Sequence, residues 1–288
     1  MKKVTLRNTS EDGKNLTVTY LPEMGMNMIS YKKDDLDVID QSTQHLFDER
    51  FAGLGALIGP HFHRRLPQIL PKIENPKAFP HIPKNSEVDP FSHGLGRYAP
   101  WQFECDETSI RATLKGDDSW NDIPIKELEG QNFTMTYHAK LSPKGLSIEM
   151  SVVSESDSIV GIHYYYHLPK GEGVITTKVK EKYIDKNEIK NIPSDLGFDK
   201  DTNTLSCSLN RDLDYTFHPY PDPTVGEIIL DAVDYKLKTQ FIAPSEECSF
   251  QLWHPKGASF VCIEPNTAQD PRHPNLSVSS IKINLQII

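Results

Sequence analysis

Polar side chains that could do chemistry gather in five short segments of the chain. In chain order these are IGPHFHRRL (58–66), SHGLGRYAPW (92–101), VGIHYYYHL (160–168), RDLDYTFHP (211–219) and FVCIEPNTAQD (260–270). One histidine on a strand is more often a half-buried, hydrogen-bonded residue than a catalyst, and one arginine is usually solvated or ion-paired. Taken together and in this order, however, the five segments indicate a functional site.

Two histidines in the first segment could ligate a metal ion. His61 and His63 are alternate residues, and alternate residues of a strand share one face, as in cupin-like sandwiches. Such a site needs a carboxylate a few residues later, and the next one, Glu74, follows only after intervening prolines. The metal-dependent alternative is therefore the weaker one, and we expect no metal. The chain has no GxSxG nucleophile elbow and no glycine-rich phosphate loop, so acyl transfer and nucleotide chemistry lack support.

The elements that would position these residues are β-strands. Apolar and polar residues alternate over 131–141 and again over 146–152, and the turn sequence Ser-Pro-Lys-Gly lies between the two runs. This pattern predicts an antiparallel hairpin. The C-terminal SIKINLQII alternates in the same way, and many shorter apolar runs add further strands. Only 45–50 and 117–128 could hold a short helix. Many short strands separated by turn signals are typical of a sandwich or barrel.

The sequence predicts one large all-β domain over residues 1–288, because no internal repeat, low-complexity tract or linker divides it. A chain of this length can bury a large single core. The longest irregular segment runs from about Leu66 to Phe91 and is rich in proline. A loop of that length in a compact domain is usually functional or mobile.

Charge and composition narrow the class of partner. Lys and Arg number 31 against 40 Asp and Glu, a formal net charge of −9, whereas nucleic-acid-binding proteins need a basic face. The N-terminal lysines are followed by no apolar region, and the most apolar run, 52–59, is too short to cross a membrane. The four cysteines are far apart, as is typical of buried thiols in a reducing compartment. We therefore expect a soluble, cytoplasmic protein.

In order and spacing, the five segments resemble motifs of the aldose 1-epimerase (galactose mutarotase) family. IGPHFHRR is similar to the family's I-G-R-x-x-N-R-I, with Pro60 and His63 replacing its first Arg and its Asn. SHGLGRYAPW is closest to the H-G-F-A-R-x-x-x-W version of hexose-6-phosphate mutarotases. HYYYHL resembles H-P-Y-F-N-L, with Tyr164 and His167 at the Pro and Asn positions. DLDYTF resembles Y-D-H-x-F, and FVCIEP resembles C-x-E-P. The similarity covers nearly the whole chain.

The resemblance implies the family's fold, a large antiparallel β-supersandwich, and its chemistry. It makes Glu264 the general base, His163 the general acid and His93 a hydrogen-bonding group near the ring oxygen of a sugar. The base takes the proton of the anomeric hydroxyl while the acid protonates the ring oxygen, and the roles reverse on closure. The implied activity is that of an aldose 1-epimerase, which interconverts the α- and β-anomers of an aldohexose or related sugar. No cofactor is expected, because no redox step occurs.

The resemblance also implies how the sugar is held. Arg64 and Asp214 would orient hydroxyl groups, and Arg97 indicates a phosphate partner, because a guanidinium binds phosphate through two hydrogen bonds. A hexose 6-phosphate is therefore an alternative to a free aldohexose, and a non-catalytic carbohydrate-binding member of the same fold is a second alternative. We expect a monomer or homodimer. Three aromatic residues either stack on the sugar or belong to the core: Trp253, Tyr164 and Tyr166.

Overall fold

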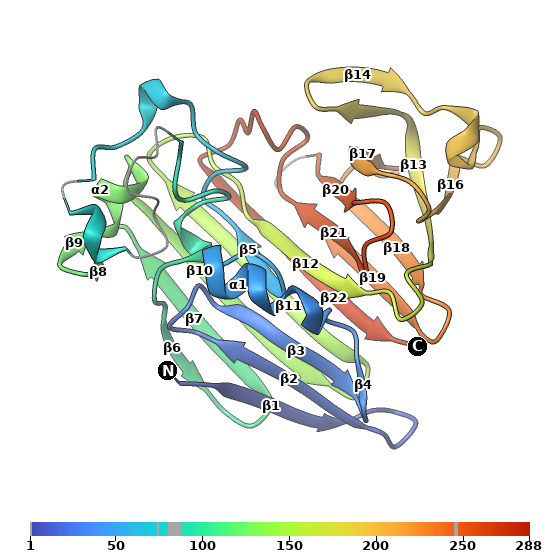
Figure 1. Ribbon diagram of the computed structural model, residues 1–288, viewed down its shortest axis with the longest axis horizontal. Coiled ribbons are helices and arrows are strands. Elements are labelled where there is room, and N and C mark those ends of the chain that lie inside the picture. Colours follow the sequence, from blue (N-terminus) through green and yellow to red (C-terminus); the bar gives the residue numbers. More distant parts are fainter. Residues whose placement is uncertain (1, 74, 80–87, 245–246) are drawn as a thin grey trace.

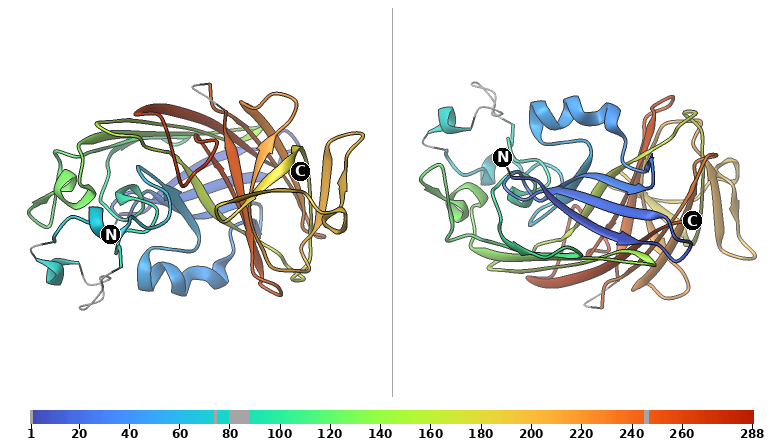
Figure 2. Two further views of the ribbon diagram at one scale, coloured as in Figure 1. Left: turned by 90° about the horizontal axis from the view of Figure 1, so that it is seen from above. Right: turned by 90° about the horizontal axis from the view of Figure 1, so that it is seen from below.

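The structure is a computed structural model that describes residues 2–73, 75–79, 88–244 and 247–288. Glu74 and part of the proline-rich segment 66–91 lie outside the described residues. The strands form two large antiparallel sheets that pack against each other (Figures 1 and 2). The larger hydrophobic core cluster draws its side chains from both sheets. The all-β sandwich expected from the alternating pattern is confirmed.

Three of the five polar segments contain strands of the first sheet, a fourth is the loop that follows its strand Gly55–Ile58, and the fifth, 92–101, lies in a loop outside it. The strands of the first sheet are, in spatial order, Val4–Thr9 (β1), Asn15–Leu21 (β2), Asn27–Lys33 (β3), Gly55–Ile58 (β5), Gly161–His167 (β12), Phe260–Asn266 (β21), Ser249–His254 (β20), Leu213–Pro219 (β17), the second part of Val174–Asp185 (β13) and Glu188–Asn191 (β14). The short strand Leu36–Asp37 (β4) pairs with β3.

The second sheet covers the inner face of the first. Its spatial order is Gln102–Cys105 (β6), Ser109–Lys115 (β7), Phe133–Ser142 (β10), Gly145–Ser154 (β11), Val278–Ile287 (β22), Lys236–Ile242 (β19), Val225–Asp231 (β18), the first part of β13, Thr204–Ser208 (β16) and Phe198–Asp199 (β15). The hairpin predicted over 131–152 is β10 and β11. Because β13 pairs in both sheets, it joins the two layers along one side.

Helices are short and peripheral. The α-helices are Gln44–Arg50 (α1) and Ile125–Glu129 (α2), and single 3₁₀ turns occur at Gln41–Thr43 (η1), Pro67–Ile69 (η2), Pro76–Ala78 (η3), Leu95–Arg97 (η4) and Ser194–Leu196 (η5). The sequence expected a helix somewhere in 117–128. Only its last residues are helical, because Ser119–Trp120 (β8) and Ile123–Pro124 (β9) form a small hairpin first. None of the helices in the described part of the chain has the length and hydropathy that a bilayer crossing requires.

The side chains of strand β12 alternate between the core and the outer face of the first sheet. Successive residues of a strand point to opposite faces. Tyr164 and Tyr166 point inward and are fully buried in the core, where the Tyr164 hydroxyl lies 3.2 Å from that of Tyr137. His163 and Tyr165 point outward and line a pocket. Of the three aromatic residues left open by the sequence, Tyr164 and Tyr166 therefore belong to the core.

Candidate functional site

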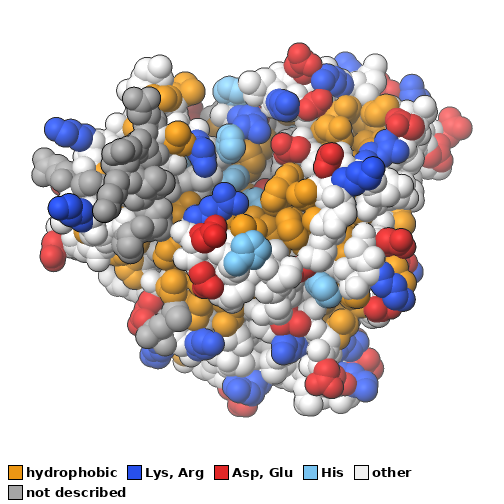
Figure 3. Space-filling view, viewed as in Figure 1, with side chains coloured by type: hydrophobic (Ala, Val, Ile, Leu, Met, Phe, Trp, Pro, Cys, Tyr) orange, Lys and Arg blue, Asp and Glu red, His pale blue; other side chains and the backbone are white. Residues whose placement is uncertain are grey.

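All five polar segments meet at one pocket of about 390 Å³ on the outer face of the first sheet. Figure 3 shows this hollow, in which histidine side chains lie between arginines and carboxylates. The pocket brings together every site residue expected from the sequence: His93, Arg64, Arg97, His163, Asp214 and Glu264. It also holds Arg50, Gln251 and Arg272, which sequence reasoning missed.

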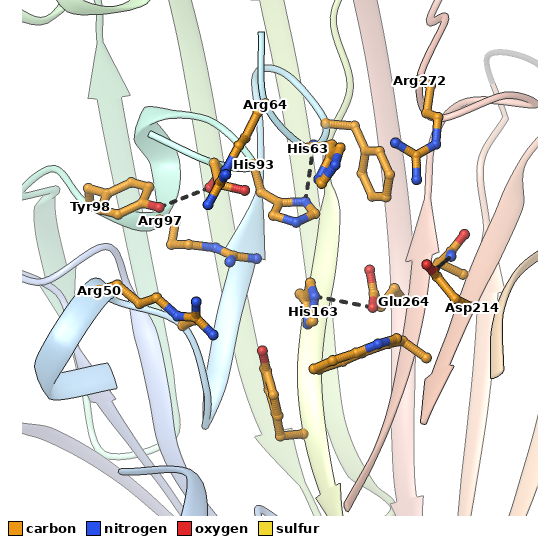
Figure 4. Close-up of a pocket in the computed structure, with 16 residues that line it drawn as sticks. Arg50, His63, Arg64, His93, Arg97, Tyr98, His163, Asp214, Glu264 and Arg272 are labelled. Atoms are coloured by element: carbon orange, nitrogen blue, oxygen red, sulfur yellow. Dashed lines mark hydrogen bonds and ion pairs between the residues drawn. The ribbon is translucent and has the colours of Figure 1, made fainter. Parts of the chain in front are cut away.

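The floor of the pocket is a carboxylate–imidazole pair on neighbouring strands. The antiparallel register of β12 and β21 places His163 directly opposite Glu264, and both side chains point outward. His163 Nε2 lies 3.2 Å from Glu264 Oε1 (Figure 4). The two residues are buried, with exposed fractions of 7% and 1%. The sheet itself therefore fixes this pair, since cross-strand neighbours on one face lie within contact distance.

The next two strands extend the floor toward a second carboxylate. Gln251 on β20 is opposite Glu264, and its side-chain amide donates a hydrogen bond of 2.5 Å to Asp214 Oδ1. Its amide oxygen accepts a hydrogen bond from the Thr216 hydroxyl, also at 2.5 Å. Gln251 thus orients Asp214 toward the pocket. A glutamine inside the apolar run SFQLWH was the only sequence signal for this role.

His93 is held above the floor by a strained loop. His63 and His93 both adopt left-handed backbone conformations, with φ of 59° and 67°. The His63 backbone N–H donates to His93 Nδ1 at 3.3 Å, so a neutral His93 carries its proton on Nε2. Gly94 has φ of 86°, and a Cβ there would lie 2.1 Å from the Gly59 carbonyl oxygen. The glycine that follows His93 is therefore a geometric requirement. Non-glycine residues in such conformations cluster at functional sites.

Burial controls the protonation of the pocket. It raises the pKa of Glu264 well above its usual value, with Arg97 opposing this shift. It lowers the pKa of His163 and of His93 well below the usual value, and the nearby Arg97 guanidinium adds to both shifts. Among the described residues, Glu264 Oε2, His163 Nδ1 and Arg97 Nη2 are buried without a hydrogen-bond partner. These atoms are the ones that a ligand in the pocket could satisfy.

The metal site considered from His61 and His63 does not form. The His61 ring is occupied by Glu129 Oε1 at 2.6 Å and by the Phe91 carbonyl oxygen at 2.9 Å, whereas His63 lines the pocket. Among the described residues, the group whose donor atoms lie within 4.8 Å of one another is instead His163, Cys262 and Glu264. Burial raises the pKa of the Cys262 thiol well above its usual value. A metal ion bound there would first have to displace that proton.

The arginines occupy two levels of the pocket. Arg97 is buried, and its Nε donates to the Leu57 carbonyl oxygen at 3.1 Å. Arg50, from the end of α1, and Arg64 are exposed at the rim. Arg272 lies on the opposite side, with its guanidinium over the Phe62 ring (Figure 4). Arg50 and Arg272 lie outside the five motif segments. Their place in the pocket therefore becomes visible only in the folded structure.

No protein-family model and no curated protein sequence matches the chain. Solved structures do match it over its full length. A galactose mutarotase-like protein from Lactobacillus casei ATCC 334 has a TM-score of 0.70 at 12% identity, covering 100% of both chains. The GalM/aldose epimerase homologue from C. elegans has a TM-score of 0.66 at 14% identity, covering 100% of this chain and 99% of the other.

A galactose mutarotase related enzyme from Lactobacillus acidophilus has a TM-score of 0.63 at 16% identity, covering 99% of this chain and 97% of that one. The chain therefore has the galactose mutarotase-like β-sandwich fold, as the resemblance of its motifs implied. Identities this low show a shared fold, and function has to be argued from the residues of the site.

Proposed function

We propose that this protein is an aldose 1-epimerase, an isomerase that interconverts the α- and β-anomers of a sugar by general acid–base catalysis. The observation that carries the proposal is the buried pair of Glu264 and His163, 3.2 Å apart at the floor of a polar pocket. A carboxylate and an imidazole are the groups that can remove and supply the two protons of hemiacetal opening.

The pair needs a single mobile proton. Glu264 takes the proton of the anomeric hydroxyl while His163 protonates the ring oxygen, and the bond between C1 and the ring oxygen breaks to leave the aldehyde. The proton count of the pair is unchanged, because Glu264 gains what His163 loses. After rotation about the C1–C2 bond, the same transfers in reverse close the ring on the other face. Burial favours the neutral forms of both groups, which is the protonation state reached after opening.

Other pocket residues would position the sugar. His93 presents its Nε2 side to the space above His163, because its Nδ1 is taken by the His63 backbone. Asp214, held by Gln251, offers carboxylate oxygens to hydroxyl groups, and Arg64 offers donors at the rim. Trp253 lines the same pocket and supplies an aromatic surface for the apolar face of the ring.

Polarimetry on freshly dissolved α-glucose and α-galactose tests the proposal. We expect the protein to accelerate the approach to anomeric equilibrium and Glu264→Gln to lose that acceleration. The matched control is His167→Asn, which alters the same strand at a histidine whose Nδ1 lies 3.2 Å from Asp40 Oδ2, away from the pocket. Saturable sugar binding without acceleration, on free sugars and on sugar phosphates alike, would instead indicate a carbohydrate-binding protein and contradict the proposal.

A further inference from the structure

Cys262 is a buried thiol beside the catalytic pair that the proposed proton exchange does not use. It stands two residues before Glu264 on β21, so the two side chains point to the same face of the sheet. Cys207 and Cys248 pack within the larger hydrophobic core cluster, whereas Cys262 is not part of that cluster although its exposed fraction is 0%. The outward direction of Cys262 therefore places its sulfur next to the floor of the pocket and not in the core.

Cys262 and the catalytic pair form a compact set of donor groups. One ligand atom from each of His163, Cys262 and Glu264 lies within 4.8 Å of the other two. Zinc bonds of ~2.0–2.3 Å put the ligand atoms of a tetrahedral site roughly 3.3–3.8 Å apart, so side-chain movements of about 1 Å would close the set around an ion. Among the described residues, Glu264 Oε2 and His163 Nδ1 are buried without a hydrogen-bond partner. Two of the three groups therefore keep a ligand atom unoccupied.

The pocket gives an ion access to this set and leaves room for a fourth ligand. His163 and Glu264 line the pocket, so an ion reaches them from solvent (Figure 4). Cys262 lies between its cross-strand neighbours Tyr165 and Trp253, whose ring centroids are 5.9 Å apart, and it is shielded from solvent there. Three protein ligands with an open fourth position are typical of accessible zinc sites, where water or a substrate oxygen completes the tetrahedron.

The nearby arginine does not oppose a divalent ion at this place. The pair of Glu264 and His163 holds one proton under the proposed function, and burial keeps the Cys262 thiol protonated, so the three groups carry no net charge. Metal binding releases both protons to solvent and leaves a thiolate, a carboxylate and a neutral imidazole around an ion of charge +2. The net charge beside the Arg97 guanidinium is therefore zero before and after binding.

We propose that His163, Cys262 and Glu264 form an inhibitory site for a divalent cation that prefers sulfur and nitrogen ligands, of which Zn²⁺ is the type. The inhibition, though not the binding, rests on the proposed function. A ligated imidazole and a ligated carboxylate cannot exchange protons with a sugar, so the loaded protein cannot open the ring. The ion is thus an inhibitor and not a cofactor. Mg²⁺ and Ca²⁺ require oxygen ligands and do not fit this donor set.

Isothermal titration calorimetry of the whole chain with ZnCl₂ and with MgCl₂ tests the site. We expect saturable binding of one Zn²⁺ per chain and no binding of Mg²⁺. Cys262→Ser should weaken Zn²⁺ binding by at least roughly 10- to 100-fold, the loss known for groups that only support a metal ligand, and should leave metal-free interconversion of anomers unchanged. Zn²⁺ binding that is equally tight in wild type and Cys262→Ser would overturn the inference.

The matched control is Cys248→Ser, at a buried thiol of the core cluster that lies 3.3 Å from the Pro223 carbonyl oxygen. A serine hydroxyl can donate to the same oxygen, and the position does not line the pocket. This variant should change neither Zn²⁺ binding nor interconversion. A loss of Zn²⁺ binding in Cys248→Ser as large as that in Cys262→Ser would contradict the assignment of the thiol.

A spectroscopic measurement identifies the thiolate ligand without a substitution in the site. Cd²⁺ bound to a thiolate gives a charge-transfer band in the ultraviolet. We expect this band in Cys105→Ser, which removes the exposed cysteine and keeps Cys262. Loss of the band in Cys105→Ser would assign the metal to the exposed cysteine and overturn the inference.

Failure of the inference differs from failure of the proposed function. Calorimetry and the Cd²⁺ band report metal binding whether or not anomers interconvert. We expect saturating Zn²⁺ to abolish the acceleration that polarimetry measures, and EDTA to restore it. An absence of acceleration with and without metal would refute the epimerase, and Zn²⁺ binding that depends on Cys262 would still support the site. Acceleration that persists when the site is loaded with Zn²⁺ would refute the inhibition.

Discussion

Two clusters of charged residues include side chains from the same loop, residues 59–65, and differ in how their charges are balanced. In the first cluster His61 Nδ1 lies 2.6 Å from Glu129 Oε1, and Arg65 Nε lies 2.8 Å from Asp89 Oδ2. Every charge there has an opposite partner. The second cluster is the pocket, which His63 and Arg64 enter from the same loop. There the arginines have no paired carboxylate within the described residues.

The pKa shifts of the two clusters have opposite signs for the same residue type. Burial alone would lower the pKa of His61, but Glu129 and Asp89 raise it above the usual value. Hydrogen bonds from His61 and Arg65 likewise overcome burial and lower the pKa of Asp89 far below its usual range. In the pocket, burial and the nearby Arg97 guanidinium both lower the pKa of His163. A balanced cluster holds fixed charges for stability, and an unbalanced one keeps protons exchangeable.

The largest expected effect is on kcat, for variants of the two residues that exchange the proton, Glu264 and His163. Glu264→Gln and His163→Asn should each reduce kcat for anomer interconversion by roughly 10²- to 10⁴-fold, as for loss of a general acid or base. The double variant should lose no more than the poorer single variant, because one proton passes between the two groups and either loss stops it. Polarimetry or NMR exchange on all three variants measures this.

His167→Asn on the same strand provides the control and should keep kcat within about twofold, since surface changes away from a site have small effects. Losses that add in the double variant would show that Glu264 and His163 act independently.

Two adjacent arginines, Arg64 and Arg65, should differ in how much each contributes to the free energy of unfolding. Arg65→Met leaves Asp89 and Glu129 buried without their guanidinium and should lower the free energy of unfolding by roughly 3–5 kcal/mol. Arg64→Met changes an exposed side chain and should shift it by less than about 0.5 kcal/mol. Urea unfolding followed by tryptophan fluorescence measures both. Equal losses would mean that Arg64 is also structural.

Most of the fold follows from the sequence because strand alternation is a local signal. The runs that became β10, β11 and β22 carry an apolar residue at every second position, and that pattern alone places one face in the core. The motifs indicated which segments meet. Three of them contain the strands β12, β17 and β21, and the other two, 58–66 and 92–101, are mainly loops.

The sequence does not predict which residues within those segments reach the pocket. Alternation predicts that His61 and His63 share a face, but His63 has φ of 59° and the loop turns there, so only His63 reaches the pocket. Arg50 and Arg272 come to the pocket from α1 and from the loop after β21, through contacts between residues far apart in sequence. No local pattern marks such residues.

The dependence of kcat/KM on pH should reflect the shifted pKa values of His163 and Glu264 in the pocket. The active pair holds one proton, so the rate falls at low pH when His163 also becomes protonated and at high pH when Glu264 loses its proton. Because burial lowers the first pKa and raises the second, we expect a wide plateau of kcat/KM that starts below pH 6.5, the usual value for histidine. Polarimetry across pH measures it. A narrow optimum between 4.5 and 6.5, the usual values of the two groups, would mean that burial has not shifted them.

The smallest effect is a pair of opposite slopes in stability against pH. His61 has a raised pKa in the folded state, so its contribution is complete below 6.5, its usual value, and is lost as pH rises through the folded pKa. The stability difference between wild type and His61→Asn should therefore shrink as the pH rises above 6.5.

His163 has a lowered pKa in the folded state, so the unfolded chain binds more protons at this residue. The stability difference between wild type and His163→Asn should therefore grow as the pH rises toward 6.5 and then level off. Urea midpoints at a series of pH values measure both. If both stability differences changed with pH in the same direction, the pKa values of His61 and His163 would be shifted in the same direction by folding. The charges around the two histidines would then not distinguish the structural cluster from the pocket.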